Sequence, residues 1–571
     1  MSVDDLTKRR ETALAIALMA AASLAVMYKQ LTGHAIFACS HEDSVLFVNW
    51  VRQVADSLAS GMLFPRWMPE SHGGYGNPTF IFYPPLVIYL TALIDLATGD
   101  LFLSVAVMKV LTLFLSGLFM YVFVRYLWGF GPGLASALVY MLLPFRVFDL
   151  YHLGVYASKF AYVWFPLILH FSKKAVVEQR LGAGTAGLAV TYGLQCLTHP
   201  LSAYMFTPVL VAFGLIVAGH GKRGLAAARL ATGCALGIAL SAFYILPVIM
   251  ERTFVHFDLL VDLDINHYWN NYLFFLFRQR SPLNPPVYGY VARVVIASVL
   301  CGVSLYLFLR PLKVHSEGYW AAFFAAVAMV PLFLMSSLSG FVWALVPGMK
   351  MLQYPTRWSA VMIFGLACLV GAGLHGLDVK GATAGGRTRA LLGLAVLLLL
   401  LCLCYDLEIM RNGCRLTDRE LGGSLRSLDV KEYVPADVSL DWLDGEANKN
   451  VSDLVSSPDE KDVTVVVKAW GPPRRMFTVN APHETVLRVR TFYYPGWKGY
   501  IDGVETPLSH ERDSGAILVK APQGEHDVTL TFTDTFDRWV GKVFSALAAF
   551  TVLLMIHPRA GLTQAREPSA R

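Results

Sequence analysis

The stretch from Phe102 to Val124 reads FLSVAVMKVLTLFLSGLFMYVFV, and Lys109 is its only charged residue. An apolar run of this length can cross the hydrocarbon core of a bilayer, which is about 30 Å thick. Similar runs recur before and after it. Together they predict about twelve membrane spans, at residues 12–28, 102–124, 131–148, 158–172, 183–199, 201–219, 228–248, 292–309, 319–337, 358–376, 390–405 and 539–556.

The composition of the whole chain agrees with a polytopic membrane protein. Of its 571 residues, 55% are hydrophobic and only 15% are charged, with a mean hydropathy of +0.51. A soluble chain carries nearer ~25% charged residues. This deficit excludes a soluble enzyme, a disordered protein and a nucleic-acid binder. The net charge of +6 is expected in cytoplasmic loops, where Lys and Arg of membrane proteins gather.

The basic residues predict the orientation of the spans. If residues 12–28 form a retained signal-anchor with a cytoplasmic N-terminus, every short loop on the inner side is basic. This holds only if the apolar stretch 81–97 does not cross the membrane. That stretch begins with Pro84 and Pro85, which suit a helix start, and we expect a helix at the outer interface. The inner segments hold Arg125, Lys173, Lys174, Arg180, Lys222, Arg223, Arg310, Lys313, Lys380, Arg387, Arg389, Arg559, Arg566 and Arg571.

Two long segments are then expected outside the membrane, which divides the chain into a membrane domain (1–405, with an outer loop at 31–100), an outer block (406–537) and a last span with a cytoplasmic tail (538–571). The outer block contains alternating or β-branched runs at 463–468, 485–491 and 528–532, separated by turn residues. These runs predict a small β-sandwich. The eight cysteines do not resemble a disulfide framework, and a bridge between Cys39 and Cys414 stays open.

Acidic residues directly after the first span are candidates for chemistry. Glu42 and Asp43 begin an amphipathic segment that runs to Leu58. A carboxylate at the membrane surface can act as a general base on an acceptor hydroxyl or ligate a divalent cation. It can also simply cap the following helix. Asp149, after the third span, lies on the same predicted side and is either a second acidic element or an interfacial anchor.

Cationic candidates precede a later span on the outer side. The segment reads Lys350-Met351-Leu352-Gln353-Tyr354-Pro355-Thr356-Arg357. Arg357 can bind a lipid phosphate through two hydrogen bonds, or it can serve as a headgroup anchor. His199 is a weaker candidate, since a lone histidine between spans is usually solvated. The residues 251–289 mix acidic, histidine and aromatic side chains, as a flexible lid would. The chain has no Walker loop, no G-x-S-x-G and no Cys-x-x-Cys pair.

The order of these motifs resembles the first outer loop of the GT-C superfamily of polytopic glycosyltransferases. After the acidic residues and the amphipathic segment come Gly61-Met62-Leu63-Phe64-Pro65-Arg66-Trp67, then Tyr75-Gly76-Asn77-Pro78, then Phe82-Tyr83-Pro84-Pro85-Leu86. The run from Phe82 to Gly129 is similar to the lipid A aminoarabinose transferase group. The motif order implies a GT-C-like fold.

A bacterial membrane family labelled "6-pyruvoyl-tetrahydropterin synthase-related" resembles the chain still more closely. The shared features are the stretch from Tyr75 to Pro85, the Thr198-His199 step and the Gln353-Tyr354-Pro355-x-Arg357 step. In the outer block, Tyr494-Pro495-Gly496-Trp497, Asp502-Gly503 and Gly524-Glu525-His526-Asp527-Val528 are similar to the β-domain of membrane proteins implicated in glycosylating cell-surface polymers.

The resemblance implies transfer of a sugar from polyprenyl phosphate to a glycan or lipid acceptor, with inversion, on the outer face of a bacterial inner membrane. It implies Asp43 as the base, with Glu42 next. Cations must stabilise the leaving phosphate. The implied substrate-binding residues are His41, Arg66, Tyr75, Asp149, His199, Lys350, Gln353 and Arg357. No cofactor is required, and a divalent cation, Mg²⁺ or Mn²⁺, stays open.

Two alternatives accompany this interpretation. The protein can instead be a noncatalytic polytopic scaffold or a lipid-glycan transporter that keeps the GT-C fold. A transporter predicts polar residues deep in several spans, whereas the candidates here cluster at the outer ends. The β-domain can hold a polymer acceptor through exposed aromatic residues such as Trp497 and Tyr500, or it can be a packing lid.

Overall fold

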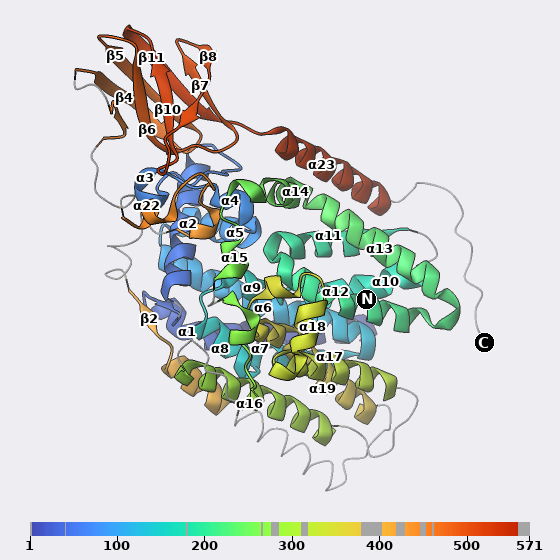
Figure 1. Ribbon diagram of the computed structural model, residues 1–571. Coiled ribbons are helices and arrows are strands. Elements are labelled where there is room, and N and C mark those ends of the chain that lie inside the picture. Colours follow the sequence, from blue (N-terminus) through green and yellow to red (C-terminus); the bar gives the residue numbers. More distant parts are fainter. Residues whose placement is uncertain are drawn as a thin grey trace.

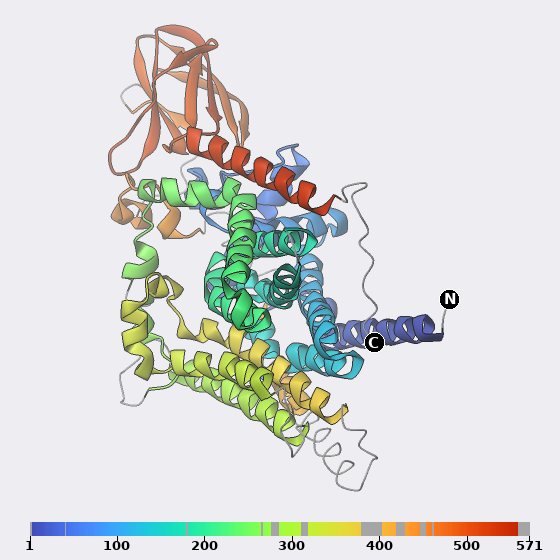
Figure 2. The ribbon, with the colours of Figure 1, turned by 90° about the vertical axis from the view of Figure 1, so that its right-hand side faces the viewer.

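The computed structural model shows a bundle of helices with a β-domain at one end (Figure 1). The last helix runs back from the β-domain along the bundle (Figure 2). The structure describes residues 3–39, 41–178, 181–263, 266–275, 285–309, 318–378, 402–417, 429–445, 453–458 and 462–557. The predicted class, mainly helical with membrane helices and a β-domain near the C-terminal end, is confirmed.

The helices follow the apolar runs of the sequence. The longer helices are α1 (Val3–Thr32), α2 (His41–Ala59), α5 (Pro85–Thr98), α6 (Leu101–Trp128), α7 (Phe130–Leu142), α8 (Pro144–His152), α10 (Trp164–Val177), α11 (Ala183–Thr198), α12 (Pro200–Ala218), α13 (Arg223–Leu240), α14 (Ala242–Glu251), α16 (Pro285–Leu309), α17 (Gly318–Leu334), α19 (Ser359–Asp378) and α23 (Phe536–Ile556). Shorter helices are α3 (Ser71–Gly74), α4 (Thr79–Phe82), α9 (Tyr156–Ala161), α15 (Leu259–Asp262), α18 (Gly340–Leu345) and α22 (Leu440–Gly445). Residues 402–411 are also helical.

Eight helical segments of the described ranges are long and apolar enough to cross a membrane. They are Asp5–Thr32, Leu101–Trp128, Phe130–His152, Pro200–Ala218, Arg223–Leu240, Gly289–Leu307, Pro355–His375 and Phe536–Ile556. Helices α5 and α17 are apolar but shorter, and the expected span at 228–248 is divided between α13 and α14. The count of twelve is therefore not confirmed. The expected span at 390–405 lies outside the described residues up to residue 401.

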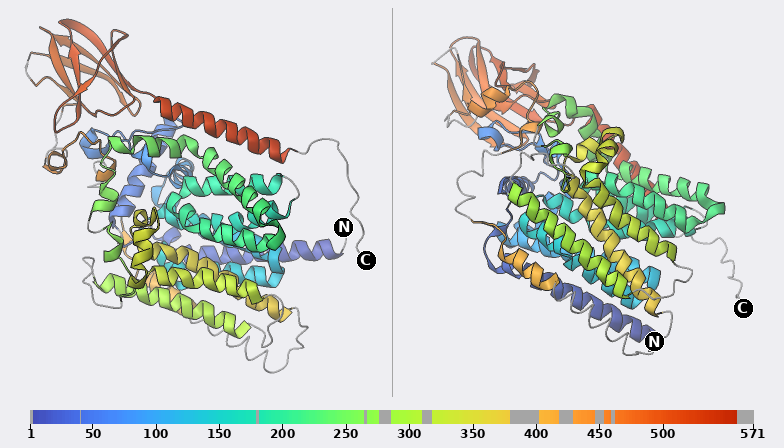
Figure 3. Two further views of the ribbon diagram at one scale, coloured as in Figure 1. Left: turned by 45° about the vertical axis from the view of Figure 1, so that its right-hand side comes forward. Right: turned by 60° about the horizontal axis from the view of Figure 1, so that its bottom comes forward.

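The helices run side by side in the bundle (Figure 3). Large apolar side chains of α6, α7, α12 and α19 form its main core, and α1 contributes Ala15, Met19 and Met27. The first apolar run is therefore an integral helix of the bundle. Helix α23 packs closely on α14, because a Cβ at Gly541 would lie only 2.6 Å from the carbonyl oxygen of Ala242.

The region between α1 and α6 contains the two helices that the sequence predicts there. Helix α2 covers the amphipathic segment, and α5 begins at Pro85 with proline in its first turn. Between them, Gly76 has φ +77°, and a side chain there would collide with the indole of Trp67. Glycine is the residue that tolerates this left-handed conformation. The Tyr75-Gly76-Asn77-Pro78 motif is thus a tight turn packed on Trp67.

The β-domain consists of two antiparallel sheets. One has the order β3-β6-β10-β9 and the other β4-β5-β11-β7-β8. The strands are β3 (Val455–Ser456), β4 (Thr464–Gly471), β5 (Arg474–Ala481), β6 (Thr485–Phe492), β7 (Trp497–Ile501), β8 (Val504–Thr506), β9 (Ser509–His510), β10 (Ala516–Ala521) and β11 (Gly524–Phe532). The predicted strands correspond to β4, β6 and β11.

The core of the β-domain is continuous with the region between α1 and α6. Its buried cluster includes Trp67, Tyr75 and Phe82 from that region. Trp497 is only 5% exposed and meets Trp67 edge to face at 5.4 Å. The prediction of Trp497 as an exposed aromatic is therefore wrong, because its ring fills the joint between the two parts.

A buried ion pair fixes the same joint. Arg538 of α23 donates to both carboxylate oxygens of Glu251, at 2.7 Å each, and Tyr494 donates to Glu251 at 2.8 Å. The two charged side chains are 0% and 2% exposed. The last helix, α14 and the β-domain therefore meet at one carboxylate.

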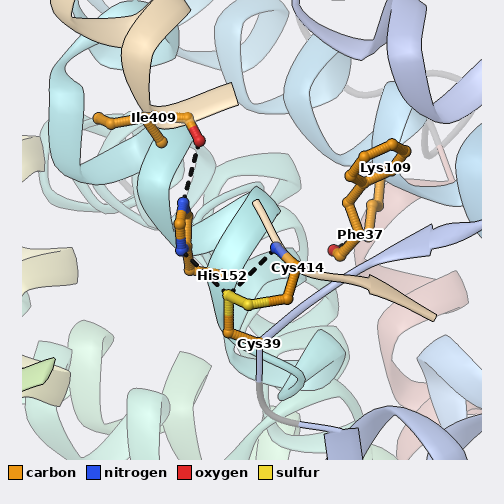
Figure 4. The surroundings of a disulfide bond; sticks show 6 residues. All are labelled: Phe37, Cys39, Lys109, His152, Ile409 and Cys414. Atoms are coloured by element: carbon orange, nitrogen blue, oxygen red, sulfur yellow. Dashed lines mark hydrogen bonds between the residues drawn. A yellow bond between two sulfur atoms is a disulfide. The ribbon is translucent and has the colours of Figure 1, made fainter. Parts of the chain in front are cut away.

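A disulfide joins Cys39, just before α2, to Cys414 (Figure 4). Next to it, β1 (Ile36–Phe37) pairs with β2 (Arg415–Leu416). Cys39 Sγ also lies 3.3 Å from His152 Nδ1. The start of α2 is therefore tied to the segment that follows residues 402–411.

Candidate functional site

A cavity of about 610 Å³ opens where α2, α8 and the segment before α19 converge. Five residues nominated from the sequence line it: Asp43, Asp149, His199, Gln353 and Arg357. Its wall also includes Leu46, Trp50, Tyr83, Phe145, Leu153, Tyr162, Leu260, Asn266, Val291, Tyr354, Val430, Glu432 and Tyr433. Polar groups thus share the space with apolar and aromatic side chains, as in many ligand sites.

Asp43 lies in the first turn of α2, together with Glu42. An acidic side chain is favoured there by the helix dipole, so the capping interpretation and a role in the cavity are compatible. Glu42 is exposed and does not line the cavity. The charges of Asp43 and Arg357 both influence the pKa of Tyr83. Burial raises the pKa of Tyr83, the charge of Asp43 raises it further, and Arg357 opposes this.

Arg357 is held by its own segment. Its Nη1 donates to the carbonyl of Leu352 at 2.9 Å, and its guanidinium lies 5.3 Å from the ring centre of Tyr354. The Tyr354 hydroxyl donates in turn to Asn266 Oδ1 at 3.0 Å. Gln353 has φ +57° and ψ −56°, and its amide donates to the carbonyl of Leu260. Such strained residues cluster at functional sites.

Asp149 lies among buried cations. Arg146, one turn earlier on α8, is fully buried, and its Nη1 lies 3.5 Å from Asp149 Oδ2. Lys159 and Lys109 are both 1% exposed and also interact electrostatically with Asp149. The Nε and Nη2 atoms of Arg146 have no hydrogen-bond partner among the described residues. Three basic side chains thus surround one carboxylate of the cavity wall.

His199 caps helix α12 rather than facing solvent. It is 7% exposed, and its Nδ1 accepts from the backbone N–H of Ser202 at 3.2 Å. The expectation of a solvated histidine is therefore wrong.

The other nominated residues lie elsewhere. Buried Arg66 pairs with Asp534 at 3.6 Å, and burial together with the nearby Arg538 lowers the pKa of Arg66 to about 10. Tyr75 stacks on Phe492 of β6 at 5.0 Å. Arg66 and Tyr75 thus belong to the joint with the β-domain. Lys350 is exposed and lies off the described wall. His41 begins α2, and its side chain is outside the described residues.

Glu432, which was not predicted from the sequence, lines the cavity from a 3₁₀ turn, Lys431–Tyr433. Burial raises the pKa of Glu432, and the charges of Asp429 and Asp43 raise it further. No sequence motif marked Glu432 as a cavity residue, because it lies in the block that was predicted to form the β-sandwich. Only the fold brings this turn to the cavity.

Asp429 explains why the turn lies there. Its carboxylate accepts from Trp50 Nε1 at 3.1 Å, from Asn77 Nδ2 at 3.0 Å and from Thr79 Oγ1 at 2.7 Å. The polar Asn77 of the Tyr75-Gly76-Asn77-Pro78 motif is the one sequence hint of such a partner. In the part of the chain that the structure describes, no three His, Cys, Asp or Glu side chains form a metal-binding group.

Comparisons with known proteins give one family. Residues 80–400 match the family described as "6-pyruvoyl-tetrahydropterin synthase related domain; membrane protein". No curated protein matches the chain.

Three solved structures are remotely similar. Arabinofuranosyltransferase AftD from Mycobacteria has 12% identity and a TM-score of 0.42, covering 72% of this chain and 27% of that one. Oligosaccharyltransferase AglB from Archaeoglobus fulgidus, in complex with an inhibitory peptide and a dolichol-phosphate, has 13% identity and a TM-score of 0.40. The match covers 71% of this chain and 56% of that one. ArnT from Cupriavidus metallidurans, bound to undecaprenyl phosphate, has 14% identity and a TM-score of 0.29. The match covers 64% of this chain and 79% of that one. The chain thus spans about a quarter of AftD and just over half of AglB.

Proposed function

The chain belongs to the 6-pyruvoyl-tetrahydropterin synthase related family of membrane proteins, and we propose that it transfers a sugar from a polyprenyl-phosphate donor to a glycan or lipid acceptor. The observation that carries the proposal is the shared cavity of Asp43 and Arg357. A carboxylate and a guanidinium in one partly enclosed space provide a base for the acceptor and a partner for the phosphate.

The reaction needs both groups at once. The acceptor hydroxyl gives its proton to Asp43 while its oxygen attacks the anomeric carbon. The bond between that carbon and the phosphate oxygen breaks, and its electron pair leaves with the phosphate. Arg357 stabilises the negative charge that develops on this oxygen, an effect that is strong in a water-poor site. The attack from the opposite face inverts the anomeric configuration.

The buried cations near Asp149 support a phosphate in this region. Three basic side chains, Arg146, Lys159 and Lys109, lie around the single carboxylate of Asp149. A buried guanidinium without full hydrogen bonding is costly, and a phosphate at the adjoining wall would satisfy the Nε and Nη2 atoms of Arg146 without a metal. Apolar wall residues such as Leu46, Phe145 and Val291 would contact the start of the prenyl chain.

The proposed reaction side is the outer face of a bacterial inner membrane, with a cytoplasmic N-terminus and the β-domain outside. The basic inner loops support this orientation. So does the disulfide between Cys39 and Cys414, because disulfides persist in oxidising compartments. Cys39 is four residues before Asp43, so the two share a side.

Asp43→Asn tests the base. In full-length protein in lipid nanodiscs, with a panel of polyprenyl-phosphate sugars, we expect transfer to fall about 10²–10⁴-fold. Glu484→Gln, an exposed change in the β-domain, is the matched control. Unchanged transfer in Asp43→Asn would remove Asp43 as the base. A parent protein that transfers no sugar from any donor would favour the noncatalytic scaffold or the lipid-glycan transporter.

A further inference from the structure

The turn that carries Glu432 is fixed on both sides. Before it, Asp429 is bound by Trp50, Asn77 and Thr79, as described above. Within it, Tyr433 is buried and stacks on Phe82, with ring centres 5.3 Å apart. After it, the carbonyl of Val434 accepts from the backbone N–H of His256 at 3.1 Å. A turn held in this way presents its side chains in set directions.

The two charged side chains of the turn have different surroundings. Lys431 is exposed and pairs with Asp444 at 2.6 Å, outside the described cavity wall. Glu432 is half-buried and lines the cavity with Asp43. The charge of Asp43 reaches Glu432. Besides Asp149, the cavity therefore holds a pair of carboxylates, Asp43 and Glu432, that come from distant parts of the sequence.

The surroundings of this pair match the chemistry of a sugar ring. Ionised carboxylates are strong acceptors for hydroxyl groups. Trp50, Tyr83 and Tyr354 line the same cavity, and aromatic rings offer apolar faces with polar edges. Carboxylates beside aromatic faces can bind the hydroxyls and the C–H face of a sugar together. An apolar lipid acceptor would offer the Glu432 carboxylate no hydroxyl group to accept from.

We propose that Glu432 is an acceptor-binding residue that accepts a hydrogen bond from the hydroxyl next to the one deprotonated by Asp43. The acceptor is accordingly a glycan with free neighbouring hydroxyls. This inference rests on the proposed transfer reaction. It adds that the segment leading into the β-domain selects the acceptor, whereas Arg357 and the buried cations bind the donor phosphate.

Sugar binding tests this without catalysis. Full-length protein in nanodiscs is titrated with methyl mannopyranoside, methyl galactopyranoside and methyl arabinofuranoside, and saturation-transfer NMR measures binding. We expect Glu432→Gln to weaken the binding of at least one probe about tenfold, the usual effect of losing a hydrogen bond to a charged group. Glu484→Gln should bind as the parent does. Binding in Glu432→Gln equal to that of the parent, or a parent that binds none of the probes, would overturn the assignment.

Kinetics separate this inference from the proposed function. With an active donor, Glu432→Gln should raise the KM for the glycan by a larger factor than it lowers the rate of donor hydrolysis by water, while Asp43→Asn should lower both reactions to a similar extent. Equal loss of both reactions in Glu432→Gln would refute an acceptor role. If the parent transfers nothing but binds a probe that Glu432→Gln releases, the transferase proposal fails and the glycan site stands. Thermal unfolding of each variant checks that it is folded.

Discussion

At the scale of single residues, Arg357 depends on geometry as well as charge. One of its N–H groups is used by the carbonyl of Leu352, and the planar guanidinium has further donors for a phosphate. Arg357→Lys keeps the positive charge but loses the planar group that can donate two parallel hydrogen bonds to a phosphate. We expect undecaprenyl phosphate to bind about tenfold more weakly, measured by tryptophan fluorescence in nanodiscs.

The matched control for this change is Arg512→Lys, at an exposed position of the β-domain. It should leave the affinity for undecaprenyl phosphate unchanged. An Arg357→Lys variant with the affinity of the parent would show that charge alone suffices at this position.

Glu432 predicts a pH dependence of stability. Burial, Asp429 and Asp43 raise its pKa above the ordinary value of 4.5, so the folded state holds this proton more tightly than the unfolded state. The contribution of Glu432 to stability is therefore most favourable below pH 4.5 and declines as the pH rises through the raised pKa. Glu432→Gln should remove this decline.

The measurement compares thermal unfolding of the parent and Glu432→Gln between pH 4 and 8. The difference between the two unfolding temperatures should change in favour of Glu432→Gln as the pH rises. A difference that does not vary with pH would contradict the raised pKa.

Individual residues were predictable where they belonged to a motif. Asp43 stood out because it follows an apolar span, and Arg357 because it precedes one. Glu432 had no such mark, since one glutamate in a polar block resembles any solvated side chain. Arg146 precedes Asp149 by three residues, a spacing that places both on one helix face, but its complete burial depends on the surrounding helices.

At the scale of elements, the start of α2 depends on the disulfide. Cys39 is bonded to Cys414 and lies two residues before the helix that carries Asp43. A double Cys39→Ser, Cys414→Ser variant should loosen this start, because a crosslink restricts the chain. Hydrogen exchange of residues 36–45 should rise at least tenfold, and sugar transfer should fall.

Cys404→Ser, at an exposed free cysteine, is the control and should change neither quantity. Exchange that remains at the level of the parent in the double variant would show that β1, β2 and the neighbouring helices hold the start of α2 without the bond.

Elements were more predictable than their boundaries. Period and composition located the strands β4, β6 and β11, and proline located the start of α5. Helix breaks inside apolar runs were not predicted. Ser241, for example, separates α13 from α14, and neither a proline nor a charged residue marks this break in the sequence. The count of twelve spans is not confirmed, partly for this reason and partly because most of the expected span at 390–405 lies outside the described residues.

At the scale of the whole molecule, the ion pair between Glu251 and Arg538 joins the β-domain to the bundle. Glu251→Gln leaves Arg538 buried with a neutral partner. We expect a loss of about 3–5 kcal/mol of stability, measured by chemical unfolding in nanodiscs, and faster proteolysis at residues 533–535.

A double variant, Glu251→Gln with Arg538→Met, removes the unpaired charge and should recover most of the loss. If the single variant is as stable as the parent, the packing of Trp67 against Trp497 holds the joint by itself.

The sequence predicted one outer face for positions 43, 149 and 357, from loop charges alone. Their convergence on one cavity is a property of the folded chain, as is the arrival of position 432 beside them. Contacts between residues far apart in the chain, such as Asp429 and Asn77, which are 352 positions apart, produce no repeating pattern in the sequence from which they could be predicted. The fold class could therefore be predicted, and the composition of the cavity only in part.

The separation of 375 residues between Cys39 and Cys414 has a consequence for biosynthesis. A ribosome must translate most of the polypeptide before the second cysteine exists, and the turn bearing Glu432 emerges later still. Each nascent molecule thus stays incompetent for both crosslinking and acceptor capture until its synthesis is well advanced. Maturation is ordered by translation itself, and a product that ends before Cys414 lacks the part of the cavity wall formed by Val430, Glu432 and Tyr433.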